Sequence, residues 1–290
     1  MSDPQSKLDS FLSGIDKNTL IPQESALDTF YKMKDVRSNT KRIVTHELSD
    51  GSAPAYIIPI GDVHLGNKGC NVRKLQYVIN LILKTPNCYT IILGDLAETA
   101  TKESVGKAMF DEDIHLPDQI AAIVSALKPL ALKGKILGVI TGNHEMRMEY
   151  LTGINPMFMI ADKLDIPYLG FQGYIRANVG QQSYNIMCHH GVGGGSTAAG
   201  KMKSAERLNK VADADIYISG HTHGLNYFFD EIMTFGQSDE IIPKKRHYVS
   251  AGSFLDYWDG YAEMKLLQPS TCGSVFIELR NDVKDVRVTI

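Results

Sequence analysis

The sequence has few cysteines and no long apolar run. Only four of its 290 residues are cysteine, and no two of them form a Cys-X-X-Cys pair. This usage favours free thiols, buried at Cys88 and Cys188, and suits a reducing compartment. The longest apolar runs fall far short of the roughly 18 residues of a membrane span, and the first ten residues are polar. We therefore expect a cytoplasmic protein with no membrane partner.

An excess of charge of either sign is also missing. Lys and Arg number 30 against 33 Asp and Glu, which gives a net charge of −3. No general basic field is present to hold nucleic acid, so such a partner would need a local patch or metal ions. Hydrophobic residues make up 43% and charged residues 22%. These values exclude a disordered, collagen-like or coiled-coil chain and indicate a globular protein.

The chain is expected to consist of an N-terminal helical extension, residues 1–40, followed by one domain, residues 41–290. The extension is rich in Ser, Asp, Lys and Gln, and its role as a packing arm, oligomer contact or tail stays open. The domain alternates strands and helices in its first half and is rich in strands in its second. Residues 71–84 and 118–133 have helical patterns, the latter kinked or broken at Pro129. The order predicts a mixed sheet or two packed sheets with helices outside.

Polar side chains of a narrow kind follow five of the expected strands. Six of the nine histidines fall at these strand ends, together with two aspartates and one asparagine. Each motif alone is a weak signal, because a single Asp or His is more often a turn, cap or core residue. Imidazole and carboxylate groups together suit divalent metals, and carboxyl ends of strands are where α/β sheets build binding sites. The whole set therefore predicts a centre for two metal ions with one bridging carboxylate.

The motifs GDVHLG (61–66), GDLAE (94–98), GNHE (142–145), HG (190–191) and GHTH (220–223) occur in this order. As a set they resemble the five signature blocks of the calcineurin-like metallophosphoesterase superfamily, over about residues 55–260. The resemblance implies an α/β fold, a four-layer αββα sandwich of two mixed β-sheets flanked by helices. It also implies a dinuclear centre in which Asp95 bridges. The first ion would take Asp62, His64, Asp95 and His223, and the second would take Asp95, Asn143, His190 and His221.

His144 is the candidate proton donor, because the resemblance places it beside the metals without ligating them. A carboxylate would hold its imidazole in the required tautomer. Many relatives have an aspartate for this role where this chain has Glu98, which could instead be a solvated acid. Arg147 could clamp the substrate phosphate or pair with Glu145 or Glu149. His189 is expected on the opposite face of its strand or behind the ligands.

The expected reaction is hydrolysis of a phosphate ester by a hydroxide that the metals activate. Protein phosphatases of this superfamily carry Asp-Arg-Gly after the second block and Arg before the third, and this chain has neither. A phosphodiester in DNA, RNA or a nucleotide is therefore favoured, with a phosphomonoesterase or a non-catalytic metal-binding scaffold as alternatives. Mn²⁺ is the expected metal, and Fe or Zn are the alternatives. The sequence does not fix the oligomeric state.

Overall fold

The computed structural model describes residues 43–100, 114–194, 197–236, 238–258, 263 and 268–290. The extension expected at residues 1–40 lies outside the described residues. All four cysteines are described and are free thiols, with Cys88 and Cys188 buried as expected. None of the described helices is long and apolar enough to cross a membrane.

The first of two sheets has five strands in the order β11-β10-β2-β3-β4. Strands β2, β3 and β4 run parallel, while β10 is antiparallel to both β2 and β11. The sheet is therefore mixed, and the carboxyl ends of its three parallel strands share one edge. The strands span Ala55–Ile57 (β2), Cys88–Ile92 (β3), Ile136–Val139 (β4), Phe276–Leu279 (β10) and Val286–Thr289 (β11).

The second sheet has six strands in the order β1-β5-β6-β7-β9-β8. Parallel pairs join β1 to β5, β6 to β7 and β7 to β9, while β5–β6 and β8–β9 are antiparallel. This sheet is mixed as well. Its strands span Ile43–Ser49 (β1), Gln172–Val179 (β5), Gln182–His189 (β6), Ile216–Ser219 (β7), Leu225–Phe235 (β8) and Ile241–Ala251 (β9).

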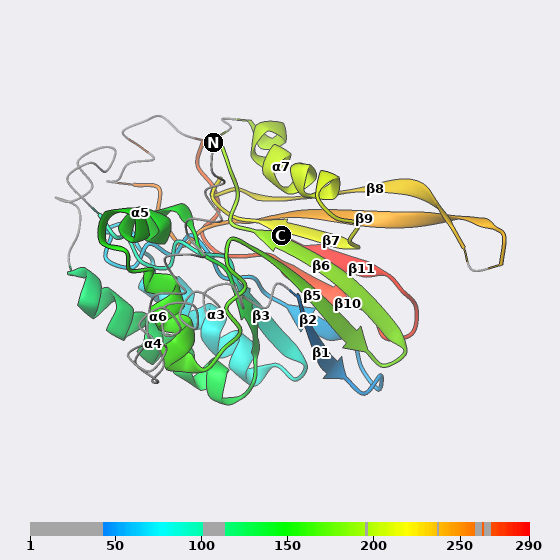
Figure 1. Cartoon of the computed structure of the whole chain (residues 1–290), viewed down its shortest axis with the longest axis horizontal. Helices are drawn as coiled ribbons and strands as arrows, with labels where there is room; N and C mark the ends of the chain where they lie inside the picture. Colours follow the sequence, from blue (N-terminus) through cyan, green and yellow to red (C-terminus); the bar gives the residue numbers. More distant parts are fainter. Residues whose placement is uncertain (1–42, 101–113, 195–196, 237, 259–262, 264–267) are drawn as a thin grey trace, which may run out of the picture. The chain divides into compact units, whose positions relative to one another are not determined.

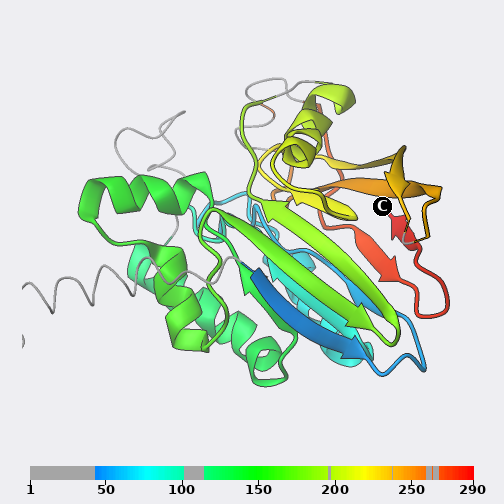
Figure 2. The ribbon, with the colours of Figure 1, turned by 45° about the vertical axis from the view of Figure 1, so that its right-hand side comes forward.

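Helices cover the outer faces of the two sheets (Figure 1). The buried side chains of α3 (Val72–Lys84), α4 (Leu116–Leu132) and α6 (Pro156–Leu164) pack in one cluster with those of β3 and β4. Helix α7 (Ala198–Arg207) packs on the other sheet, against Tyr217 and Tyr248. In Figure 2 α7 lies over its sheet, apart from the other helices. The expected αββα order is thus confirmed.

The main core lies between the two sheets. It joins inward side chains of the first sheet, such as Ile91 and Leu137, to those of the second, such as Ile186 and Ile218. These strands are buried on both faces, which explains why they appear in the sequence as continuous apolar runs rather than as alternating patterns. Packing of the two sheets fixes how their carboxyl ends meet, and the functional residues lie at those ends.

Two local expectations differ from the structure. Pro129 does not end its helix, because α4 continues to Leu132. A proline in a helix removes one backbone N–H donor and so one hydrogen bond. Pro129 lies in the last turn of α4, so few helical residues follow this lost bond. Helices α5 (Asn143–Thr152) and α6 and strand β5 were not expected. Only Glu145 of α5 is buried, so its sequence shows no apolar stripe of the kind that indicates a helix.

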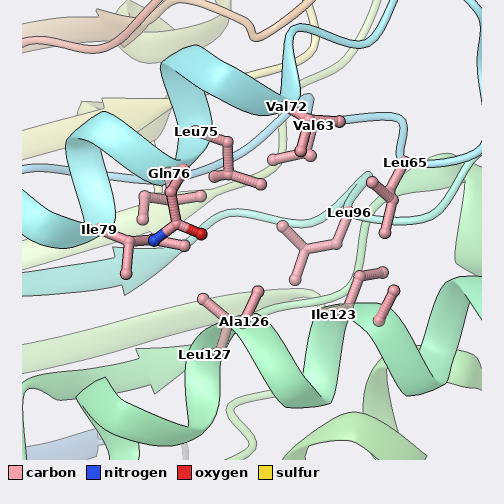
Figure 3. Close-up of a pocket in the computed structure, with 12 residues that line it drawn as sticks. Val63, Leu65, Val72, Leu75, Gln76, Ile79, Leu96, Ile123, Ala126 and Leu127 are labelled. Carbon is pink, nitrogen blue, oxygen red and sulfur yellow. The ribbon is translucent and has the colours of Figure 1, made fainter.

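A cavity of about 110 Å³ lies between α3 and α4 and is almost entirely apolar (Figure 3). Val63 and Leu96, which adjoin candidate metal ligands in the chain, are among its lining residues. Gln76 supplies the one polar side chain. A phosphate ester needs charged or several hydrogen-bonding partners, and Gln76 alone does not supply them. The candidate active site lies instead among the polar strand-end loops.

Candidate metal centre and active site

The loops after five strands meet at one place. Strands β2, β3 and β4 direct their carboxyl ends to one edge of the first sheet, and β6 and β7 do the same in the second. Two hydrogen bonds tie the edges together: His190 Nδ1 lies 2.7 Å from the Leu93 carbonyl, and the His221 backbone N donates to Asp62 Oδ2 at 2.8 Å. The structure thus brings all seven candidate ligands to one region.

The backbone of most candidate ligands is in a left-handed conformation. Non-glycine residues rarely adopt a positive φ, and each such residue costs about 1–3 kcal/mol. Here the φ values lie between 50° and 67° for five of the seven candidate ligands. The surrounding structure therefore holds these side chains in orientations that an isolated loop would not keep. The five residues are Asp62, His64, Asp95, His221 and His223.

The loops after β3 and β4 are in direct contact. A Cβ atom on Gly94 would clash with the backbone of Gly142, so both loops need glycine at this crossing. The Glu145 carboxylate, in the first turn of α5, fastens them further, because buried N–H groups of both loops donate to it. The donors are the backbone nitrogens of Asp95 (2.9 Å), Leu96 (2.8 Å), Ala97 (3.3 Å) and Gly142 (3.1 Å).

Asp62, His64 and His223 form the first group of candidate ligands. Their nearest side-chain atoms lie within 4.8 Å of one another. Asp62 Oδ1 is 3.3 Å from His223 Nε2 and 4.0 Å from His64 Nε2. Asp62 Oδ1 and His64 Nε2 are both buried and make no hydrogen bond. Such unsatisfied atoms are costly, and a cation between them would satisfy both.

Asp95, His190 and His221 form the second group, again with ligand atoms within 4.8 Å. The Asn143 side chain belongs with them, because its Oδ1 lies 2.9 Å from His190 Nε2. This asparagine begins α5, so the helix delivers an amide oxygen to the group. The contact with the Leu93 carbonyl occupies His190 Nδ1 and leaves Nε2 directed at Asp95 and Asn143.

Asp95, a member of the second group, also approaches the first. Its Oδ2 is 3.1 Å from His190 Nε2 and 3.9 Å from His64 Nε2. Its Oδ1 accepts the backbone N–H of His144 at 2.9 Å, at the positive end of α5. Burial opposes ionisation, yet the His190 imidazole holds the pKa of the Asp95 carboxyl well below its usual range. Asp95 is therefore an anion with partners in both groups.

The donor set fits divalent metal ions. Carboxylate, amide and imidazole ligands suit this class of ion. A metal-binding histidine commonly donates its second ring N–H to a carboxylate or carbonyl, and two candidate ligands do so. Glu98 Oε2 lies 3.0 Å from His64 Nδ1, and the Leu93 carbonyl plays this part for His190. In both rings Nε2 faces the centre of the site.

We expect metal binding to release protons and to strengthen as pH rises toward 9. Burial opposes protonation of both rings. The Glu98 hydrogen bond nevertheless raises the pKa of His64 to about 9, and the Asp95 charge raises that of His190 to about 10. Both imidazoles are therefore protonated at neutral pH, and a metal must displace the proton on Nε2. Calorimetric titration in two buffers of different ionisation enthalpy measures the protons released. Equal heats in both buffers, with metal bound, would contradict this expectation.

The contact between Glu98 and His144 differs from the expected one. The Glu98 carboxylate contacts His64, and its other oxygen stays 4.0 Å from His144 Nδ1. His144 Nδ1 instead lies 2.6 Å from the Glu98 backbone carbonyl. A carbonyl oxygen can only accept, so Nδ1 carries the hydrogen and Nε2 is left toward the site. Thr99 Oγ1 also donates to the His144 carbonyl at 2.7 Å.

The remaining predicted residues lie near the site in different ways. Arg147 is half-buried on α5, four residues after Asn143, so both side chains lie along one face of the helix. His189 accepts a hydrogen bond from the Gly191 backbone N at its Nδ1, at 2.8 Å. His189 belongs to neither group of candidate ligands. The segment from Gly191 to Thr197, which precedes α7, includes residues outside the described ranges.

Three contributions were missed from the sequence: the Leu93 carbonyl, the Glu145 carboxylate and the Glu98 backbone. Carbonyl groups leave no trace in a sequence, because every residue has one. The Glu145 position does carry a signal, since an acid three residues after the cap residue of a helix is a known capping pattern. That signal is present in GNHE. The sequence does not show, however, that the same carboxylate also accepts hydrogen bonds from the loop after β3.

Comparison of the sequence with known protein families identifies the family of this chain. Residues 56–225 match the family model of calcineurin-like phosphoesterases. The match spans more than half of the chain, and the chain belongs to this family, whose members act on phosphate esters and bind divalent metals. No curated protein matches the sequence.

Solved structures that are similar to this chain include two with 14% identity. One is a conserved uncharacterized protein of Streptococcus pneumoniae TIGR4, described as a predicted phosphoesterase, with 14% identity and a TM-score of 0.36. The other is a double mutant of Vps29 from Entamoeba histolytica, with 14% identity and a TM-score of 0.35. Each alignment covers 81% of this chain and 89% of the other.

Proposed function

We propose that this protein is a phosphodiesterase that uses two divalent metal ions, with Mn²⁺ as the first choice and Fe or Zn as alternatives. Asp95 would bridge the ions, because its Oδ2 lies among imidazoles of both ligand groups. This placement is the observation that carries the proposal. The first ion would be held by Asp62, His64, Asp95 and His223, and the second by Asp95, Asn143, His190 and His221.

The two ions, when bound, supply an activated water and neutralise charge on the phosphate. The chain then has to give the leaving oxygen a proton. His144 Nε2 faces the site, 4.0 Å from Asp95 Oδ2. His144 clusters with His64 and Glu98, outside the two ligand groups proposed here. The Glu98 carbonyl holds the ring from behind through Nδ1. His144 is therefore the group we assign to protonate the leaving oxygen.

Two observations bear on the substrate: the position of Arg147 and the sequence pattern of the motifs. A guanidinium can bind two phosphate oxygens at once, and Arg147 shares the face of α5 that presents Asn143. The features that mark protein phosphatases are missing from the second and third motifs. We therefore favour an internucleotide or nucleotide diester, in DNA, RNA or a free nucleotide. The cytoplasmic location stays a prediction from the sequence.

Hydrolysis assays on metal-stripped protein test the proposal. The substrates are bis-p-nitrophenyl phosphate, p-nitrophenyl phosphate and a dinucleotide, each with added Mn²⁺, Fe²⁺ or Zn²⁺. We expect metal-dependent cleavage that favours the diesters. The His144→Ala variant should lose about 100-fold or more on the dinucleotide, whose alkoxide leaving group needs a proton. Glu206→Gln, an exposed acid on α7, is the control and should match the wild type.

The other outcomes each point elsewhere. Preference for p-nitrophenyl phosphate would replace the diester proposal by a phosphomonoesterase. Binding of two ions without cleavage of any substrate would favour the non-catalytic scaffold. Full activity in His144→Ala on the dinucleotide would remove the proton donor assigned here.

A further inference from the structure

Glu98 contacts two imidazoles through two different parts of the residue. Its side chain, 4% exposed, meets His64 Nδ1 at 3.0 Å through Oε2. Its backbone carbonyl meets His144 Nδ1 at 2.6 Å. The two rings pack edge to face with centroids 4.5 Å apart. One residue therefore supports a candidate metal ligand and the candidate proton donor, by bonds that do not share an atom.

The backbone around Glu98 explains this division. Its N–H donates to the Leu65 carbonyl at 3.0 Å, and Leu65 pairs with Ala97 in a short parallel bridge. Glu98 is thereby fixed beside the loop that carries His64. The carbonyl direction follows from this pairing and does not depend on the side chain. The carboxylate also accepts a hydrogen bond from the Asn67 side chain, in the same loop, which holds it toward His64.

We propose that the Glu98 side chain positions the metal ligand His64, while the Glu98 backbone carbonyl independently positions His144. A carboxylate on Nδ1–H fixes the ring, makes Nε2 a stronger ligand and adds negative charge near the ion. His64 Nε2 is the buried atom that lacks a hydrogen-bond partner, as this role requires. This inference rests on the proposed metal centre. It implies that a change of the Glu98 side chain alters metal binding without altering proton donation by His144.

Metal titration of Glu98→Ala and Glu98→Gln is the first test. Calorimetry with Mn²⁺ on the metal-free full-length protein should show one of two sites weakened by about 10–100-fold in Glu98→Ala. Glu98→Gln keeps an acceptor oxygen without the charge, so its loss should be smaller. It also serves if Glu98→Ala does not fold. Glu206→Gln should bind as the wild type does.

The second test compares leaving groups at saturating Mn²⁺. A proton donor matters most for a poor leaving group such as an alcohol and little for p-nitrophenol. The ratio of kcat for p-nitrophenyl and alkyl diesters should therefore shift in His144→Ala and stay at the wild-type value in both Glu98 variants. If Glu98 had only a structural role, its replacement would change the metal affinity and the leaving-group ratio together.

Two results would overturn the inference alone. One is wild-type affinity for both ions in Glu98→Ala. The other is a leaving-group ratio in the Glu98 variants that shifts as it does in His144→Ala, because the carboxylate would then serve the proton donor. A wild-type protein that binds no Mn²⁺, Fe²⁺ or Zn²⁺ would instead contradict the proposed metal centre, and this inference with it.

Discussion

Replacement of Asp95 by asparagine is expected to lower phosphodiester hydrolysis by roughly 1,000-fold or more. The amide keeps the size of the side chain and can still accept the backbone N–H of His144 at the start of α5. It removes the negative charge that lies among His64, His144 and His190. Two cations cannot share a neutral amide as they share a carboxylate, so at least one ion should be lost. Metal analysis of the purified variant, together with kcat on a dinucleotide, measures both effects.

The control for Asp95→Asn is the same change at an exposed acid. Asp213 is 70% exposed and pairs with Lys244 at 2.7 Å, at the start of the segment that leads into β7. Asp213→Asn should keep both metals and full activity. If Asp95→Asn bound two ions with wild-type affinity, Asp95 would not be the bridge, and the assignment of both ligand groups would have to change.

Replacement of Glu145 by glutamine is expected to destabilise the protein by about 3–5 kcal/mol. Four backbone N–H groups donate to the two carboxylate oxygens. A glutamine would present its own NH₂ to one pair of these donors, leaving buried donors facing each other. The loss corresponds to a fall in Tm of roughly 10 °C. Urea unfolding of the metal-free protein is the direct measurement, because bound metal would mask part of the effect.

Glu149→Gln provides the matched comparison on the same helix. Glu149 is half-buried and accepts a hydrogen bond from Asn155 at 2.7 Å, which a glutamine can still accept. Its cost should be about 1 kcal/mol or less. Equal effects of the two substitutions would show that the four bonds of Glu145 contribute little. The loops after β3 and β4 would then have to be held by their glycine contact alone.

Much of the fold was predictable because its central strands β3, β4 and β7 are buried on both faces. The apolar runs before Gly61, Gly94 and Gly142 mark strands whatever their partners are. The helix at α3 was equally visible from its apolar face, whose residues are buried in the structure. Helix α5 was not, because one buried acid rather than an apolar stripe holds it in place. Its stability comes from a neighbouring loop that is distant in sequence.

The sequence predicted which residues are candidate ligands, but it did not predict which of their atoms contact one another. Their types and order pointed to a metal centre, since six of nine histidines and the key acids follow strands. Which oxygen meets which imidazole depends on loops held at positive φ and on contacts between two sheets. Glu98 shows the limit: its place in the motif suggested His144, and the fold turned its carboxylate to His64.

The sequence by itself determined the family of this protein, the kinds of candidate ligand and the strand ends that carry them. These follow from local patterns, in which residue type and spacing are enough. Only the tertiary structure decided the partners of each group, such as the four donors to Glu145 and the Leu93 carbonyl behind His190. Hydrogen bonds of 2.6–3.3 Å depend on the packing of elements far apart in the chain, and no local pattern records that packing.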